Sequence, residues 1–350
     1  MKNVTKTWYG ILALFVPLSG LARPSCAQVK PVATVLAIQG SQFTVNDQPT
    51  FLIGASYYGG LGASTETIRQ DLDDLHGLGV NWIRVWATWD SYGENVSALD
   101  KQGRPRDPYA GRLQGLVSEC DRRGMIVDVT LARSRPAEGT PRSVHLPDIE
   151  AHQEAVRSVV SLLAEHHNWY LDLANERDVG DDRFVAVTEL YALRSLARQL
   201  CPRLLVTASF GGHDLSDDDV RDAIQKVECD FLAVHRPRHR KTAVQTERET
   251  RKLETMLKKM EKVVPIHHQE PFRRGYAGWE PVAEDFVTDL RGAIAGGAAG
   301  WCFHNGSTRT SNDGQPRRSF DLRQTRLMKQ LDGEELKVMQ QIKTLLANGV

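Results

Sequence analysis

The chain has 350 residues with 41% hydrophobic content, enough to bury a large core as two average domains or as one α/β barrel. Its 44 basic side chains equal its 44 acidic ones, so no global field favours nucleic acid or an anionic membrane surface. The composition therefore favours a small neutral substrate and no nucleic-acid partner.

The first residues have the order of a secretory signal. Two lysines precede the apolar stretch "WYGILALFVPLSGLA", and the small-residue sequence "SCA" follows it. The apolar stretch is short for a membrane span, and Pro17 and Gly20 interrupt it. We predict that residues 1–27 are a signal peptide, so that the protein is secreted or periplasmic with no membrane span after cleavage. An uncleaved N-terminal anchor is the alternative.

Cleavage after Ala27 leaves four cysteines, too few for a disulfide scaffold. Cys201 and Cys229 each come just before a predicted strand and would share the bottom face of a barrel. One disulfide between them and free buried thiols are both compatible with the sequence.

Residues 28–50 alternate short apolar runs with turn residues, which predicts a small β-hairpin before a first strand that ends near Ser56. Seven more short apolar runs follow, each typical of a buried strand. They lie at residues 80–87, 125–131, 169–175, 203–209, 230–235, 263–270 and 298–304.

The segments between these runs carry apolar residues three and four apart, the pattern of helices with one buried face. Strands and helices that alternate eight times predict a single (β/α)8 barrel over residues 51–350. A doubly wound open sheet is the alternative, but "ASYYGGLGAS" lacks the G-x-G-x-x-G spacing such sheets normally carry after the first strand. Long connections after the second and third strands are expected to shape a cleft.

Two of the predicted strands end on glutamates, Glu176 after the fourth and Glu270 at the seventh. Side chains at the carboxyl ends of barrel strands face the active site, so these glutamates should lie across the barrel mouth from one another. Paired carboxylates of this kind serve retaining glycoside hydrolysis. Taken alone, each glutamate is more typical of an ordinary ion pair or helix start.

Other polar and aromatic strand ends fit the same site. Arg84 would keep Glu270 ionised as the nucleophile, and the charge of Glu270 would hold Glu176 protonated as the acid. Asn175 would donate to the substrate's 2-hydroxyl. Trp301 would offer a flat face to a sugar ring, although a core tryptophan fits the apolar "GAAGWCF" equally well.

The sequence resembles the clan-A retaining glycoside hydrolases, and cellulases and β-mannanases of family 5 in particular. The matching segments are "FLIGASYY", "GVNWIRVW", "NWYLDLANE", "VPIHHQE" and "GWCFHN". The resemblance implies a carbohydrate substrate, no cofactor, and double displacement on a β-linked poly- or oligosaccharide with Glu176 as acid/base and Glu270 as nucleophile. It adds Tyr58, Trp86 and His235 to the expected substrate-binding residues. It leaves open the sugar, the linkage and the oligomeric state.

The sixth strand departs from the family pattern. Many clan members have His-x-Tyr there, with the tyrosine supporting the nucleophile, whereas this chain reads His235-Arg236-Pro237-Arg238. Tyr58 or an arginine could occupy the space of the missing tyrosine. Six basic residues follow strands six and seven: Arg236, Arg238, His239, Arg240, Arg273 and Arg274. They could bind the carboxylate or sulfate of an acidic glycan, or simply form a solvated charged loop.

Two other classes of function are alternatives. A metal-dependent hydrolase would use the pairs His166-His167 and His267-His268, but neighbouring residues of a strand point to opposite faces, and no His-Glu-x-x-His motif occurs. We therefore expect no metal site. A catalytically inactive sugar-binding barrel is the second alternative, and the missing tyrosine is the feature in its favour.

Overall fold

The computed structural model describes Met1 and residues 33–91, 94–131, 146–178, 183–274, 279–305 and 320–347. The predicted signal peptide therefore lies outside the described residues, apart from Met1. Most of the connection after the third barrel strand, residues 132–145, also lies outside them.

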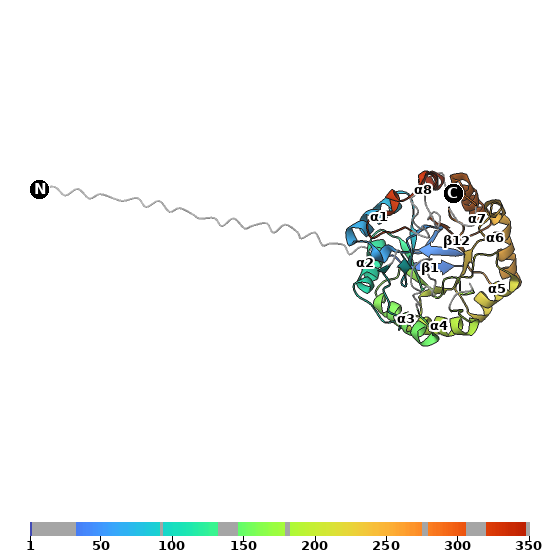
Figure 1. Cartoon of the computed structure of the whole chain (residues 1–350), viewed down its shortest axis with the longest axis horizontal. Helices are drawn as coiled ribbons and strands as arrows, with labels where there is room; N and C mark the ends of the chain where they lie inside the picture. Colours follow the sequence, from blue (N-terminus) through green and yellow to red (C-terminus); the bar gives the residue numbers. More distant parts are fainter. Residues whose placement is uncertain are drawn as a thin grey trace. The chain divides into compact units, whose positions relative to one another are not determined.

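Within these ranges, eight parallel strands form one sheet, and the helices surround it (Figure 1). The sheet runs in the order β10-β9-β8-β5-β4-β13-β12-β11, and a parallel bridge between Ser209 and Ala233 joins its two edges. The strands are β4 (Leu52–Ser56), β5 (Trp82–Trp86), β8 (Ile126–Thr130), β9 (Trp169–Asp172), β10 (Leu205–Thr207), β11 (Leu232–His235), β12 (Ile266–Glu270) and β13 (Gly300–Phe303). The predicted (β/α)8 barrel is confirmed.

The helices lie between the strands along the chain. They are α1 (Thr65–Gly77), α2 (Tyr109–Asp121), α3 (Ile149–Leu162), α4 (Val187–Leu200), α5 (Asp217–Arg221), α6 (Thr242–Lys259), α7 (Ala283–Ala295) and α8 (Gly333–Ala347). In α1, Ser64 caps the first turn by accepting from the amide of Thr67, and Ile68, Leu72 and Leu75 are buried. This helix shows how a stripe of apolar residues fixes the face that packs on the barrel.

A small antiparallel sheet precedes the barrel, formed by β1 (Leu36–Gln39), β2 (Gln42–Val45) and β3 (Gln48–Thr50). The predicted hairpin was therefore incomplete, because the second turn adds a third strand. Phe43 of β2 packs edge-on against Phe231, with ring centroids 5.0 Å apart, and against His267 at 5.7 Å. Since Phe231 comes just before β11, this sheet covers the amino-terminal end of the barrel and leaves the opposite end for the site.

The cysteines of the described residues, Cys120, Cys201, Cys229 and Cys302, are free thiols. Of the two alternatives for Cys201 and Cys229, the structure has the thiols and not the disulfide. Among the described helices, none is both long and apolar enough to cross a membrane.

Candidate active site

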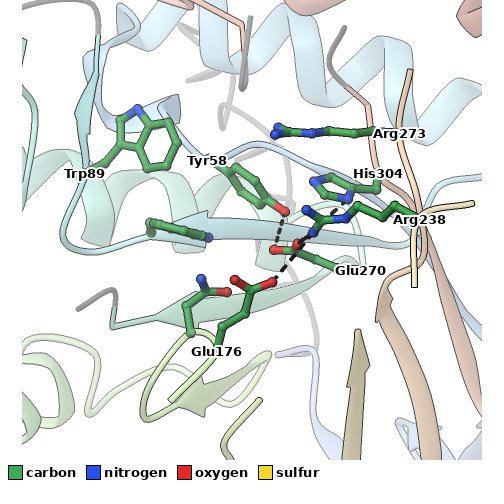
Figure 2. Close-up of a pocket in the computed structure, with 9 residues that line it drawn as sticks. Tyr58, Trp89, Glu176, Arg238, Glu270, Arg273 and His304 are labelled. Carbon is green, nitrogen blue, oxygen red and sulfur yellow. Dashed lines mark hydrogen bonds and ion pairs between the residues drawn. The ribbon is translucent and has the colours of Figure 1, made fainter. Parts of the chain in front are cut away.

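A pocket opens at the carboxyl ends of the barrel strands (Figure 2). The described residues that line it are Tyr58, Trp86, Trp89, Asn175, Glu176, Arg238, Glu270, Arg273 and His304. The two glutamates predicted from the sequence therefore meet in one pocket. One oxygen of each carboxylate and a ring nitrogen of His235 lie within 4.8 Å of one another.

Glu270 ends β12 and is almost fully buried. Its Oε1 accepts a hydrogen bond from the hydroxyl of Tyr58 at 2.8 Å and another from Nη1 of Arg84. Its Oε2 accepts from Nη2 of Arg238 at 2.8 Å. Burial acts to raise the pKa of Glu270, but the charges of His235, Arg84 and Arg238 outweigh it and hold that pKa well below its usual range. Glu270 is therefore a carboxylate, as a nucleophile must be.

Glu176 lies four residues beyond the end of β9 in the left-handed backbone region, with φ 47°. A non-glycine residue in this region is uncommon and often marks a functional site. Its backbone amide donates to Oγ of Ser209 at 3.0 Å, which fixes the turn. The carboxylate therefore lines the pocket from a backbone position that this hydrogen bond fixes.

The pKa of Glu176 differs from the sequence-based expectation. Burial and the charge of Glu270 act to raise this pKa, but the hydrogen bond from His235 at 3.2 Å and the charge of Arg238 at 3.6 Å lower it to about 2. The expectation that the charge of Glu270 holds Glu176 protonated is therefore wrong, because His235 and Arg238 outweigh that charge. Both carboxylates are ionised, and Arg238 contacts both of them.

The ring of His235 lies between two acceptor oxygens. Its Nδ1 faces Glu176, and its Nε2 lies 2.8 Å from Oε1 of Gln269. The amide nitrogen of Gln269 donates to Asp128 and to Asp172, so its oxygen must face His235. Burial acts to lower the pKa of His235, but the two glutamates raise it above its usual value. A doubly protonated ring satisfies both acceptors.

Arg84, in β5, is completely buried beneath the pocket. It forms ion pairs with Asp128 at 3.2 Å, with Asp172 at 2.9 Å, and with Glu270. It also donates to Oδ1 of Asn175 at 2.9 Å, which orients that amide. The predicted contact between Arg84 and Glu270 is therefore present. The sequence did not predict that Asp172 pairs with Arg84, because residues 169–175 have the pattern of an apolar strand.

Three aromatic rings form one wall of the pocket. The ring centroids of Tyr58 and Trp86 are 4.9 Å apart, and those of Trp86 and Trp89 are 4.8 Å apart. Such a wall can pack against the apolar face of a sugar ring. Tyr58 and Trp86 were predicted for the site, and Trp89 extends the surface they make.

Trp301 is not part of this wall, so the expectation that it faces the sugar is wrong. Its side chain is fully buried, and its Nε1 donates to Asp289 of α7 at 2.7 Å. Side chains alternate along a strand, and in β13 it is Cys302 that joins the cluster inside the barrel. Trp301 therefore points outward to the helices, and His304, two residues beyond Cys302, lines the pocket.

Only part of the predicted basic cluster lies in the pocket, and the other members form ion pairs elsewhere or are exposed. Arg236 is buried and pairs with Asp214, and Arg274 pairs with Asp332 at 2.7 Å. His239 and Arg240 are exposed. Only two members of the cluster, Arg238 and Arg273, are among the described pocket residues. Tyr58 and Arg238 both contact Glu270, so both of the proposed substitutes for the missing tyrosine are present.

The donor atoms of Glu176, His235 and Glu270 are close enough to bind a metal ion. The contacts around them do not fit one, because the guanidinium of Arg238 already contacts both carboxylates and both ring nitrogens of His235 already face oxygens of Glu176 and Gln269. The other histidine pairs do not converge. His267 lies in the barrel interior against Trp82, whereas Nε2 of His268 lies 2.9 Å from the hydroxyl of Thr250 in α6.

Neither a protein-family model nor a curated protein matches the sequence. The structure, in contrast, is similar to many solved structures. An endo-1,4-β-mannanase from Rhizomucor miehei shares 14% identity at a TM-score of 0.62, covering 90% of this chain and 99% of that one. A family 5 mannosidase mutant from the same fungus has 14% identity and a TM-score of 0.65, covering 90% and 98%.

A β-1,4-D-mannanase from Cryptopygus antarcticus shares 14% identity at a TM-score of 0.57, covering 89% of this chain and 95% of that one. At this level of identity the likeness is one of fold. The (β/α)8 barrel predicted from the sequence is thus also the fold of these glycoside hydrolases.

Proposed function

We propose that this protein is a retaining glycoside hydrolase that cleaves a β-linked poly- or oligosaccharide, with Glu270 as nucleophile and Glu176 as acid/base. The observation that carries the proposal is the separation of the two carboxylates, whose nearest oxygens lie within 4.8 Å at the carboxyl ends of the barrel strands. Retaining enzymes place their carboxyl groups about 5–5.5 Å apart, and inverting enzymes about 6.5–9.5 Å apart. The gap here fits direct attack on the sugar rather than a water held between sugar and base.

In the first step, an oxygen of Glu270 attacks the anomeric carbon, and the glycosidic C–O bond breaks with its electron pair on the departing oxygen. Glu176 gives that oxygen its proton. In the second step, Glu176 takes a proton from water, the water oxygen attacks the anomeric carbon, and Glu270 leaves as a carboxylate. Oε1 of Glu270 is held by Tyr58 and Arg84, so Oε2 is the attacking atom.

The surrounding residues support these steps. Tyr58 and Arg84, which donate to Oε1, stabilise the Glu270 carboxylate when it leaves in the second step. Asn175 lines the pocket beside Glu176, where its amide can contact the 2-hydroxyl of the sugar. The wall of Tyr58, Trp86 and Trp89 provides the stacking surface for the ring. An endo-1,4-β-mannanase and a family 5 mannosidase share this fold, which supports the proposed chemistry by analogy.

A panel of aryl β-glycosides and β-linked polysaccharides tests the proposal with the wild type, Glu176→Gln and Glu270→Gln. We expect turnover by the wild type and a loss of at least about 10⁴-fold for Glu270→Gln. Glu176→Gln should lose about 10²–10⁴-fold on poor leaving groups and less on nitrophenolate, which needs little protonation. Glu254→Gln, on the outer surface of α6, is the matched control and should keep full activity.

Two outcomes would contradict the proposal. Sugar binding by the wild type without turnover would favour the inactive sugar-binding barrel. A fully active Glu270→Gln protein would exclude the assigned nucleophile.

The proposal includes export of the protein to the periplasm or the medium. Its support is the order of basic, apolar and small residues over positions 1–27. Export is tested by mass spectrometry of the intact protein recovered from the periplasm or the medium of the native cell. We expect a chain that begins at Gln28, and a cytoplasmic chain that keeps Met1 would contradict it.

A further inference from the structure

Two arginines project into the pocket from the loops that follow β11 and β12. The side chain of Arg238 is 10% exposed, and Arg273 is 6% exposed. Figure 2 shows both side chains entering from the side of the pocket opposite Trp89, close to His304. Burial lowers the pKa of His304 well below its usual value, and the charges of Arg273 and Arg238 outweigh part of the opposing effect of Glu270.

Arg238 occupies the place where the reaction must occur. Its Nη2 lies 2.8 Å from Oε2 of Glu270 and 3.6 Å from Oε1 of Glu176. That position lies in the gap between the nucleophile and the acid, where an anomeric carbon would be attacked. The free cavity in the pocket measures about 20 Å³, room for about one water molecule. Because Arg238 contacts both carboxylates, a sugar whose anomeric carbon lies between them must displace this side chain.

The same displacement changes the protonation of Glu176. Arg238 is one of the two groups that lower the pKa of Glu176 to about 2, and at that pKa the carboxyl carries no proton for a leaving group. Withdrawal of Arg238 removes an attractive positive charge, so the pKa of Glu176 rises while Glu270 remains ionised beside it. Movement of one side chain thus frees the nucleophile and removes one of the two contacts that lower the pKa of Glu176.

The displaced guanidinium needs a new anionic partner, since an arginine moved away from two buried carboxylates loses strong charge-assisted hydrogen bonds. A neutral sugar offers only hydroxyl groups. A substrate carboxylate or sulfate offers two oxygens in the geometry that a guanidinium binds through two parallel hydrogen bonds. Arg273, on the same side of the pocket, adds positive charge for the same group.

We propose that the substrate is a β-linked glycan whose sugar at the cleaved bond carries an anionic substituent, the carboxylate of a uronic acid or a sulfate, and that this substituent binds Arg238 beside Arg273. The proposal rests on the hydrolase activity proposed above. The aromatic wall holds the apolar face of the ring, and the arginines hold its charged edge. Binding of the anion withdraws Arg238 from Glu176 and Glu270, so Arg238 is a specificity-determining residue.

Matched substrates test this proposal. The aryl substrates are the 4-nitrophenyl β-glycosides of glucose, galactose and mannose, each beside its uronic acid and its 6-sulfate. The polymers are β-linked polyuronides beside the same polymers with their carboxyl groups chemically reduced to alcohols. The variants are Arg238→Gln, Arg238→Lys and, as control, Arg240→Gln, whose exposed side chain is on the same loop.

We expect the wild type to prefer the anionic member of at least one matched set by about 10²-fold or more in kcat/KM. Arg238→Gln should lower that preference at least about tenfold, Arg238→Lys should keep part of it, and Arg240→Gln should keep all of it. Preference for the uronide or for the 6-sulfate identifies the source of the anion. The preference ratio separates recognition from a general defect, because a general defect changes the rates on both members of a set alike.

Two results would overturn the inference while leaving the hydrolase intact. One is faster cleavage of the neutral member in every set that is cleaved. The other is an anionic preference that Arg238→Gln leaves unchanged. Absence of turnover on all substrates, by contrast, would contradict the hydrolase activity itself.

Discussion

The hydroxyl of Tyr58 donates to Oε1 of Glu270 at 2.8 Å, joining the loop after the first barrel strand to the end of the seventh. Burial raises the pKa of Tyr58 well above its usual value, so the hydroxyl remains a donor at every working pH. Arg84 donates to the same oxygen, whereas Arg238 contacts the other one. Tyr58 and Arg84 thus fix Oε1 of Glu270, whereas Oε2 is the oxygen that reacts once Arg238 has moved.

Tyr58→Phe removes one donor to the Glu270 carboxylate and keeps the ring of the aromatic wall. A hydrogen bond to a charged group contributes about 1.5–3 kcal/mol, so kcat should fall about 10- to 100-fold. Steady-state kinetics on the substrate found in the panel measures this. An unchanged kcat would show that Arg84 and Arg238 suffice to hold the carboxylate.

Arg84→Gln removes the cation from a buried cluster that contains Asp128, Asp172 and Glu270. Breaking a buried ion pair leaves uncompensated charge and costs about 3–5 kcal/mol in the free energy of unfolding. Urea denaturation measures the loss. Arg251→Gln, which breaks an exposed pair with Glu247 on α6, should cost less than about 0.5 kcal/mol. Equal losses for the two variants would contradict the role of Arg84.

Arg238→Gln should move the alkaline limb of the pH profile of kcat/KM to higher pH. This limb reports the acid of the free enzyme, and Arg238 lowers the pKa of Glu176 by favouring its charged form. Removal of the cation raises that pKa, so Glu176 keeps its proton at higher pH. A limb that stays in place or moves to lower pH would show that Arg238 does not act on Glu176.

Trp301→Phe should affect stability and leave catalysis intact. The indole is fully buried and donates to Asp289 of α7, and burial raises the pKa of this aspartate to about 6. Loss of the donor leaves a buried acceptor with one bond fewer and should cost about 1–3 kcal/mol in thermal or urea unfolding. The kcat/KM should stay within about threefold of the wild type. A change in KM without a change in stability would indicate that Trp301 contacts the substrate.

The strand order and the two glutamates could be predicted because both depend on local signals. Short apolar runs of strand length indicated the eight strands, and the carboxyl ends of such strands lie at the barrel mouth. Alternation along β13 also predicts that Trp301 and His304 face opposite sides, but which of them faces the pocket follows only from the structure, where Cys302 points inward.

The state of Glu176 could not be predicted in this way. The charge of Glu270 predicts a raised pKa for Glu176, whereas His235 and Arg238, which come from another strand and its loop, lower that pKa. The reach of a long side chain from a loop depends on tertiary structure. For the same reason, the basic cluster did not reveal that Arg236 would pair with Asp214 while Arg238 would enter the pocket.

The assignment of Glu270 as nucleophile is tested most directly by trapping the glycosyl-enzyme intermediate. A 2-deoxy-2-fluoro analogue of the cleaved sugar, with dinitrophenolate as leaving group, should form the covalent bond quickly and hydrolyse slowly. Intact mass and peptide mapping of the trapped protein should show one sugar per chain, attached to Glu270 and absent from Glu270→Gln. A label on Glu176, or turnover that releases the inverted anomer without a label, would contradict the account.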